Sequence, residues 1–290
     1  MAVDIWWNHV AFLLHMDGTH GGTTFTDEQG STVTVGGAVT TTTSVKQFGT
    51  AGGDFPGANA DLLSLPNSGD MNFGTGNLTI EGWFKCTTTS RQYMTLCEKD
   101  NGAFGVGSWS LIINHAAATD GLLAFYLRDF HATNALLITT VTAYNDNVFH
   151  HVAVVRNGNQ WIMFVDGVLK IGATSAVTVT DLAVATLLGN SVYVSRGWTG
   201  TLDEWRITKG QARYTVAFTA PTAAFPGTFD DGTHVGATGA TGAAGLSLAG
   251  EPGPAGADGK GSTVILPRPP EKYDVNDQRQ ARRLIEQAFR

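Results

Sequence analysis

Few residues of this chain have the types and spacing that catalysis or metal binding requires. Its 290 residues contain no Ser-His-Asp signature, no phosphate-binding loop and no Cys-His zinc spacing. His150 and His151 are adjacent, and adjacent side chains of a strand point to opposite faces, so the two cannot bind one metal ion together. We interpret them as scaffold, with a ligand role for either one as the alternative. Asp166, followed by glycine, fits a turn better than a site.

Only two cysteines are present, Cys86 and Cys97, which is too few for a disulfide framework. Residues 1–7 lack the basic region of a signal peptide, and the apolar run Val10–Leu14 is too short for its core. No apolar stretch is long enough to cross a bilayer, so we expect neither a membrane partner nor secretion. In a reducing cytoplasm both cysteines are expected to be buried free thiols, with a bridge between adjacent strands as the alternative.

Charge and composition narrow the class of protein. The net charge is −7, and residues 262–290 hold six basic and four acidic residues, which leaves −9 for residues 1–261. An acidic body repels phosphate backbones, so we expect no nucleic-acid partner. Only 15% of residues are charged and 36 are glycine, a mixture that favours β-structure with many turns.

Short apolar runs alternate with polar residues from about residue 8 to residue 207, which is the period of half-buried strands. Residues 152–156, 161–165 and 168–171 give the clearest prediction. Asn157-Gly158 and Asp166-Gly167 separate them, and such pairs supply the positive φ that primed hairpin turns need. Many strands without a helical stretch predict an all-β, two-sheet sandwich over residues 1–226. One face of residues 78–86 is predicted to carry Leu78, Ile80, Gly82, Phe84 and Cys86.

After a linker at residues 227–235, glycine recurs at every third position of residues 236–261, with one two-residue insertion. Only glycine fits at the crowded axis of three chains, so this period predicts a short collagen-like triple-helical stalk and a homotrimer. A flexible Gly-Ala linker is the alternative. The glycines that carry the period are Gly236, Gly239, Gly242, Gly245, Gly250, Gly253, Gly256 and Gly259.

Three prolines predict an extended connector over residues 262–273, and residues 274–290 have the period of an amphipathic α-helix. Its apolar face includes Leu284, Ile285 and Phe289. A helix this short is marginal alone, so that face must pack on something. We expect it to anchor the chain to another protein, with bundling of three copies as the alternative.

Several ordered motifs of residues 8–226 resemble the laminin-G-like, concanavalin A-like lectin/glucanase domains common in tailed-bacteriophage structural proteins. Together they are specific for this family, whereas each alone is weak. The resemblance implies a jelly-roll sandwich and a place on the virion. The motifs are Val10–Gly18, Leu78–Phe84, Phe149–Arg156, Phe164–Gly167, Gly200–Ile207, Ala212–Tyr214 and Phe218–Pro221.

The resemblance also directs attention to particular side chains. Glucanases of this fold carry Glu-x-Asp-x-x-Glu on a catalytic strand; here Glu98 and Asp100 match, but Ala103 replaces the third carboxylate. Two-carboxylate hydrolysis is therefore not expected, and we predict that the chain is not an enzyme. Related sandwiches hold a structural calcium ion with aspartates placed like Asp17 and Asp203. Those aspartates could instead cap a turn and pair with a nearby arginine.

Sugar binding in such modules rests on aromatic rings that stack on a pyranose face. Tyr193 and Trp198 are our candidates for this role, together with Trp6 and Trp7 near the N-terminus; core packing is the alternative for each. The leading hypothesis is a trimeric bacteriophage fibre or spike with a lectin-like head for host-surface glycans, held on the virion by its C-terminal segment. A carbohydrate-binding module of a bacterial surface or secreted protein is the alternative.

Overall fold

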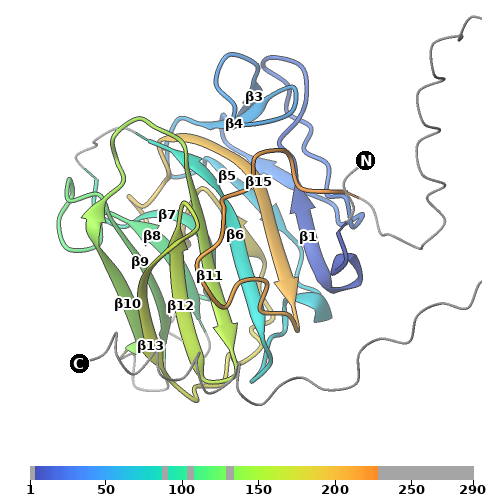
Figure 1. Cartoon of the computed structure of the whole chain (residues 1–290). Helices are drawn as coiled ribbons and strands as arrows, with labels where there is room; N and C mark the ends of the chain where they lie inside the picture. Colours follow the sequence, from blue (N-terminus) through green and yellow to red (C-terminus); the bar gives the residue numbers. More distant parts are fainter. Residues whose placement is uncertain (1–3, 87–90, 103–107, 129–133, 228–290) are drawn as a thin grey trace, which may run out of the picture. The chain divides into compact units, whose positions relative to one another are not determined.

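The computed structural model describes residues 4–86, 91–102, 108–128 and 134–227, which form two antiparallel sheets packed face to face (Figure 1). The predicted all-β sandwich is thus confirmed. The predicted stalk, connector and C-terminal helix lie outside the described residues. Within the described ranges, no helix is long and apolar enough to cross a membrane. The elements are η1 (Trp7–His9), β1 (Val10–Leu14), β2 (Thr34–Gly36), β3 (Thr40–Thr42), β4 (Gly52–Phe55), β5 (Leu62–Leu65), η2 (Gly69–Met71), β6 (Leu78–Lys85), β7 (Met94–Lys99), β8 (Trp109–Ile113), β9 (Leu122–Arg128), β10 (Asn134–Ala143), β11 (His150–Asn157), β12 (Gln160–Val165), β13 (Val168–Thr174), β14 (Thr186–Leu188) and β15 (Gly200–Lys209).

The two sheets interleave distant parts of the chain. The eight-stranded sheet has the order β13-β12-β11-β6-β15-β4-β3, and β1 also pairs with β15. The seven-stranded sheet has the order β10-β9-β8-β7-β14-β5-β2. Because β15 lies between β6 and the N-terminal strands β1 and β4, the sandwich closes only when both ends of the domain are in place. This wrapping is that of a jelly roll.

The predicted meander is present as β11, β12 and β13, with one shift in its first turn. Asn157 pairs with Gln160 as the last strand residue, so the two central turn residues are Gly158 and Asn159 rather than Asn157 and Gly158. Of these two, only Gly158 has a positive φ, of 60°, which a turn with glycine first requires. The second turn is as predicted, because Asp166 and Gly167 both have positive φ.

Strand β6 has the two faces that its sequence predicts. Ile80 and Phe84 lie in the core between the sheets, whereas Glu81 points to the outer face of the eight-stranded sheet. Gly82 leaves room for the ring of Trp205, since a Cβ there would lie 2.1 Å from Trp205 Cε3. Cys86 and Cys97 are both buried and free, as predicted. Burial raises the pKa of the Cys86 thiol to about 12, which makes it a poor nucleophile.

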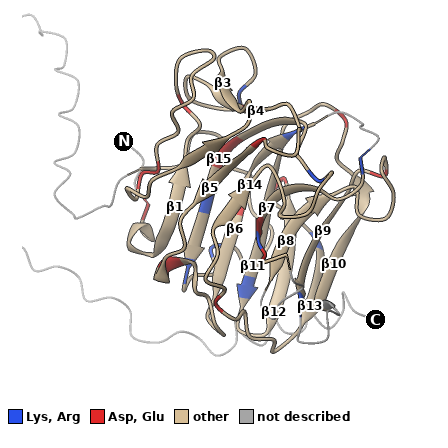
Figure 2. Ribbon diagram, turned by 180° about the vertical axis from the view of Figure 1, so that it is seen from behind, with Lys and Arg blue, Asp and Glu red and all other residues tan. Residues whose placement is uncertain are grey.

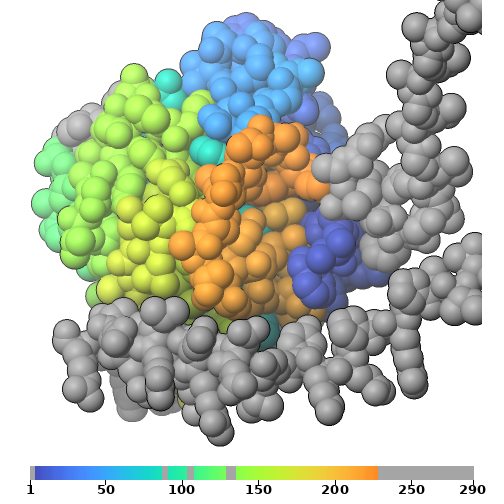
Figure 3. Space-filling view, in the orientation of Figure 1, coloured from blue at the N-terminus to red at the C-terminus, as the bar shows by residue number. Residues whose placement is uncertain are grey.

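Residues 211–227 form a strap across the outer face of the eight-stranded sheet, coloured orange in Figures 1 and 3. The ring of Phe218 stacks on Tyr214 with centroids 3.7 Å apart and meets Phe164 of β12 edge to face. The backbone N–H of Phe218 donates to the carbonyl of Gly167 in the β12–β13 turn. The strap therefore covers the outer face of the sheet around Phe164 and the β12–β13 turn.

Candidate functional site

Residues 189–198 cross the outer face of the seven-stranded sheet, which faces the viewer in Figure 2. The backbone N–H of Thr95 in β7 donates to the carbonyl of Arg196 at 2.9 Å. The side-chain amide of Asn190 donates to three backbone carbonyls of residues 58–61, at 3.0 to 3.1 Å. These bonds fix an irregular segment on the sheet and place its side chains beside the start of β7.

A groove of about 580 Å³ lies between this segment and the residues that lead into β7. Its backbone is unusual, because Tyr93 and Ser195 both have positive φ, of 58° and 61°. Non-glycine residues rarely adopt this conformation, and such positions gather at ligand sites. The residues that line the groove are Arg91, Gln92, Tyr93, Val194, Ser195 and Arg196. We call these six residues, together with Tyr193, which contacts Arg196, the tyrosine–arginine groove.

Arginine–aromatic contacts organise the tyrosine–arginine groove. The guanidinium carbon of Arg196 lies 5.0 Å from the ring centroid of Tyr93 and 4.5 Å from that of Tyr193. Arg128 of β9 approaches the same Tyr193 ring at 6.0 Å. Arg91 donates through Nη1 to the carbonyls of Gly57 and Gly197, which holds its side chain at the groove. Such cation–π pairs orient both partners.

The two carboxylates that could suggest hydrolysis lie near this groove but are closed off from solvent. Glu98 is fully buried, and its carboxylate accepts hydrogen bonds from the Val192 N–H at 2.7 Å and the Ser110 hydroxyl at 3.0 Å. Burial raises the pKa of Glu98 to about 7. Asp100 is also buried, with Arg128 Nε 3.7 Å from its Oδ2. Because Val192 lies on the Glu98 carboxylate, a substrate would have to displace residues 189–198 to reach it.

The predicted sugar-binding aromatics separate into two groups. Tyr193 is half-buried at the edge of the tyrosine–arginine groove. Trp198 is fully buried and packs edge to face on Phe84, so the prediction that its ring faces a ligand is wrong. We expected Trp198 to be exposed because it lies near the end of a strand, but its side chain packs into the core between the sheets. Trp6 is 37% exposed and lines a separate pocket of about 260 Å³ beside the strap, whereas Trp7 packs on a small apolar cluster.

Asp17 and Asp203 both hold the loop that precedes β4. Asp17 accepts hydrogen bonds from Thr50 and from the Ala51 N–H, the latter at 3.1 Å. Asp203 accepts from the backbone N–H groups of Gln47 at 2.6 Å and Phe48 at 3.1 Å. Burial raises the pKa of Asp203 to about 7. In the described residues no group of three or more His, Cys, Asp or Glu side chains could hold a metal ion, so a calcium site would need loop carbonyls and stays a prediction.

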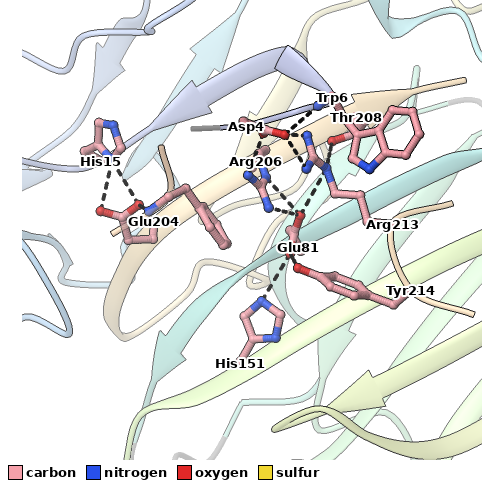
Figure 4. Close-up of polar contacts among 11 residues, drawn as sticks. Asp4, Trp6, His15, Glu81, His151, Glu204, Arg206, Thr208, Arg213 and Tyr214 are labelled. Carbon is pink, nitrogen blue, oxygen red and sulfur yellow. Dashed lines mark hydrogen bonds and ion pairs between the residues drawn. The ribbon is translucent and has the colours of Figure 1, made fainter. Parts of the chain in front are cut away.

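A buried charge network joins the outer face of β6 and β15 to both ends of the domain (Figure 4). Glu81 accepts from Arg206 at 2.7 and 2.9 Å and from the Tyr214 hydroxyl at 2.8 Å. Asp4 accepts from Arg206 at 2.9 Å and from Arg213 at 2.7 and 2.9 Å. Burial alone would raise the pKa of Glu81, but the charge of Arg206 holds it far below the usual range. Through Arg213 and Tyr214, the network holds the strap against the outer face of the eight-stranded sheet.

The adjacent histidines have different surroundings, as the period of a strand predicts. The ring of His150 lies between Asp166, with Nδ1 2.7 Å from Oδ2, and Asp146, with Nε2 3.1 Å from Oδ1. His151 is buried beside the outer-face network, with Nε2 3.3 Å from Glu81 Oε2. Because their rings contact different faces, they share no ligand.

Sequence reasoning missed Tyr93 and Arg196, the centre of the tyrosine–arginine groove. The two are about one hundred positions apart, and no periodic pattern joins residues of irregular segments. The one signal for the groove in the sequence was a loop in which a tyrosine and an arginine, Tyr193 and Arg196, are three residues apart.

Comparisons with solved structures find the same fold in binding domains. The binding domain of Paraclostridial Mosquitocidal Protein 1 is 14% identical, with a TM-score of 0.57, over 72% of this chain and 50% of that one. The botulinum neurotoxin serotype G binding domain is 13% identical, with a TM-score of 0.53, over 71% and 48%. This chain thus spans about half the length of these toxin domains.

Domain 4 of AbnA, a GH43 extracellular arabinanase from Geobacillus stearothermophilus solved with arabinotriose, is 14% identical, with a TM-score of 0.52, over 70% of this chain and 93% of that one. No curated protein sequence matches the chain. The profile of the family described as the concanavalin A-like lectin/glucanases superfamily, Laminin_G_3, matches residues 57–213, more than half of the chain. The chain is therefore a member of the concanavalin A-like lectin/glucanases superfamily.

Proposed function

We propose that the sandwich is a non-catalytic glycan-binding head and that the tyrosine–arginine groove is its binding site. The observation that carries this is the pair of rings, Tyr93 and Tyr193, that both contact the guanidinium of Arg196 at an open groove. Aromatic faces stack on the apolar faces of sugar rings, and groups such as Gln92 and Ser195 supply hydrogen bonds to hydroxyls. The burial of Glu98 and Asp100 supports binding without hydrolysis.

At the level of the whole chain, the proposed function is that of a trimeric bacteriophage fibre protein that presents this head on the virion to host-surface glycans. The glycine period of residues 236–261 supports a trimer. The apolar positions Leu284, Ile285 and Phe289 support attachment of the C-terminal segment to another virion protein. Deletion of residues 274–290 should abolish incorporation into particles while the sandwich still folds; a truncated trimer that is still incorporated would contradict the anchor.

A second candidate is a carbohydrate-binding module of a bacterial surface or secreted protein. The similarity to domain 4 of the arabinanase favours it, because that whole domain is matched over 93% of its length. Immunogold labelling of intact phage particles distinguishes the two, since only a virion protein is labelled there.

The groove is tested by screening the purified full-length chain on a glycan array, followed by titration calorimetry with the best ligand. Tyr193→Ala should weaken binding about tenfold or more, because a stacking partner is lost. Trp6→Ala is the matched control, since it removes an exposed ring at the other pocket, and it should bind as the parent does. If Trp6→Ala loses binding and Tyr193→Ala keeps it, the binding site is the pocket beside the strap and not the groove. If the parent chain binds no glycan on the array, the proposal is wrong.

A further inference from the structure

The charge of the tyrosine–arginine groove is opposite to that of the domain around it. Residues 1–227 hold 11 Lys or Arg and 17 Asp or Glu, a net charge of −6. Two arginines, Arg91 and Arg196, line the groove, and none of its lining residues among those that the structure describes is acidic. Glu98, the acidic residue of β7, has its pKa raised to about 7 by burial, and its oxygens accept hydrogen bonds from Val192 and Ser110. The groove is thus a positive site on a negative domain.

Arg196 differs from the other arginines of the described residues. Arg206 and Arg213 are paired with buried carboxylates, and Arg128 lies near Asp100. Arg156 donates to the carbonyls of Gly158 and Gly74. In the part of the chain that the structure describes, the guanidinium of Arg196 has neither a carboxylate within 4.0 Å nor a hydrogen-bond acceptor.

Such an arrangement leaves the donors of Arg196 available. Its guanidinium is oriented by two ring contacts, with Tyr93 and Tyr193, which leave its N–H groups unused. A guanidinium fork matches a carboxylate or a phosphate with two parallel hydrogen bonds, and prior orientation lowers the entropy lost on binding. Arg91 adds a second positive charge at the same groove. A neutral sugar would leave the guanidinium of Arg196 without an anionic partner.

We propose that the tyrosine–arginine groove binds an anionic saccharide, with the carboxylate or phosphate of the ligand on Arg196 and its sugar ring on the tyrosines. This inference rests on the proposed glycan-binding function and narrows it to acidic ligands. Uronic acid polymers and polyol phosphate polymers supply the same chemistry from different sources.

Binding is measured by titration calorimetry on the full-length chain with three probes: oligogalacturonate, its neutral methyl ester, and a glycerol phosphate oligomer. At least one anionic probe should have a dissociation constant about tenfold or more below that of the methyl ester, because the neutral ligand cannot make the charge-assisted contact. The anionic probe that binds identifies the source. Raising the salt concentration should weaken that binding more than binding of the neutral probe.

Arg196→Gln should remove the preference for the anionic probe, and Arg196→Lys should restore only part of it, because lysine keeps the charge and loses the fork. Lys170→Gln is the matched control: it removes one positive charge and a cation–π contact, with Tyr144 at 5.9 Å, on another strand. A preference lost equally in Lys170→Gln would overturn the proposal. Equal binding of neutral and anionic probes, still dependent on Tyr193, would overturn it while leaving the glycan-binding proposal intact; no binding of any glycan would refute both.

Discussion

Glu98, which matches the first carboxylate of the glucanase motif in the sequence, is buried, and its carboxylate accepts a hydrogen bond from the Val192 N–H. Two-carboxylate hydrolysis needs an acid and a base on either side of the scissile bond. Glu98 and Asp100 cannot flank a substrate that cannot enter. We therefore expect no release of reducing sugar from β-glucan, laminarin or agarose by the purified chain; turnover that Glu98→Gln abolishes would show the opposite.

The raised pKa of Glu98 predicts a pH dependence of stability. The folded state holds the proton of Glu98 up to about pH 7, whereas the unfolded chain releases it near 4.5. The stabilisation is therefore full below about pH 4.5 and is lost as the pH rises to about 7, by roughly 3 kcal/mol. In Glu98→Gln the amide oxygen can still accept from the Val192 N–H, and the amide NH2 can donate to the Ser110 hydroxyl. Because the amide does not titrate, the difference in melting temperature between this variant and the parent should shift in favour of the variant from pH 5 to pH 8. A difference in melting temperature between Glu98→Gln and the parent that stays the same from pH 5 to pH 8 would contradict the raised pKa of Glu98.

Calcium binding by Asp17 and Asp203 is a separate prediction at this scale. Both carboxylates hold the loop before β4, so an ion shared with loop carbonyls would fix that loop and stabilise the native state by mass action. Excess EDTA should then lower the melting temperature, and readded calcium should restore it. Asp203→Asn should melt lower in calcium and be insensitive to EDTA. A parent melting curve that EDTA leaves unchanged returns both residues to a purely structural role.

At the scale of elements, β6 shows how tightly the strands specify one another. Gly82 lies opposite Val152 of β11 in a central strand, and the ring of Trp205 from β15 fills the space that a side chain would need. Gly82→Ala would place Cβ 2.1 Å from that ring, so we expect a loss of about 1–3 kcal/mol or more from overpacking. Thermal melting measures it, with Gly69→Ala as the control, because a Cβ added there would meet no atom within 4 Å beyond the neighbouring residues. Equal melting of the two variants would contradict this view of the core.

The sequence predicts elements better than it predicts the site. The two faces of β6 and the β11–β13 meander follow from a period of two and from turn residues, which are local properties. The burial of Trp198 and the shift of the first turn to Gly158-Asn159 depend on packing and register. The tyrosine–arginine groove joins Tyr93 to Arg196 through an irregular segment, so no local pattern could reveal it.

At the scale of the molecule, the glycine period makes the strongest statement about assembly. Glycine recurs at every third residue over 236–259, with one two-residue insertion, and this period predicts three chains wound together. Three heads would raise the avidity for a repeated surface glycan well above the affinity of one groove. Light scattering of the full-length chain at micromolar concentration should therefore give the mass of a trimer.

Gly253→Val tests the cause of that trimer, because a side chain at the axis of a triple helix disrupts the winding. The variant should dissociate at lower temperature than the parent, while the melting of the sandwich, followed by tryptophan fluorescence, stays the same. Ala255→Val is the control, since it adds a branched side chain beside the same triplet without replacing a glycine. If the parent chain is a monomer, or if the two variants dissociate equally, residues 236–261 are a flexible linker and not a triple helix. If only Gly253→Val loses the trimer, the stalk is the element that joins the three heads.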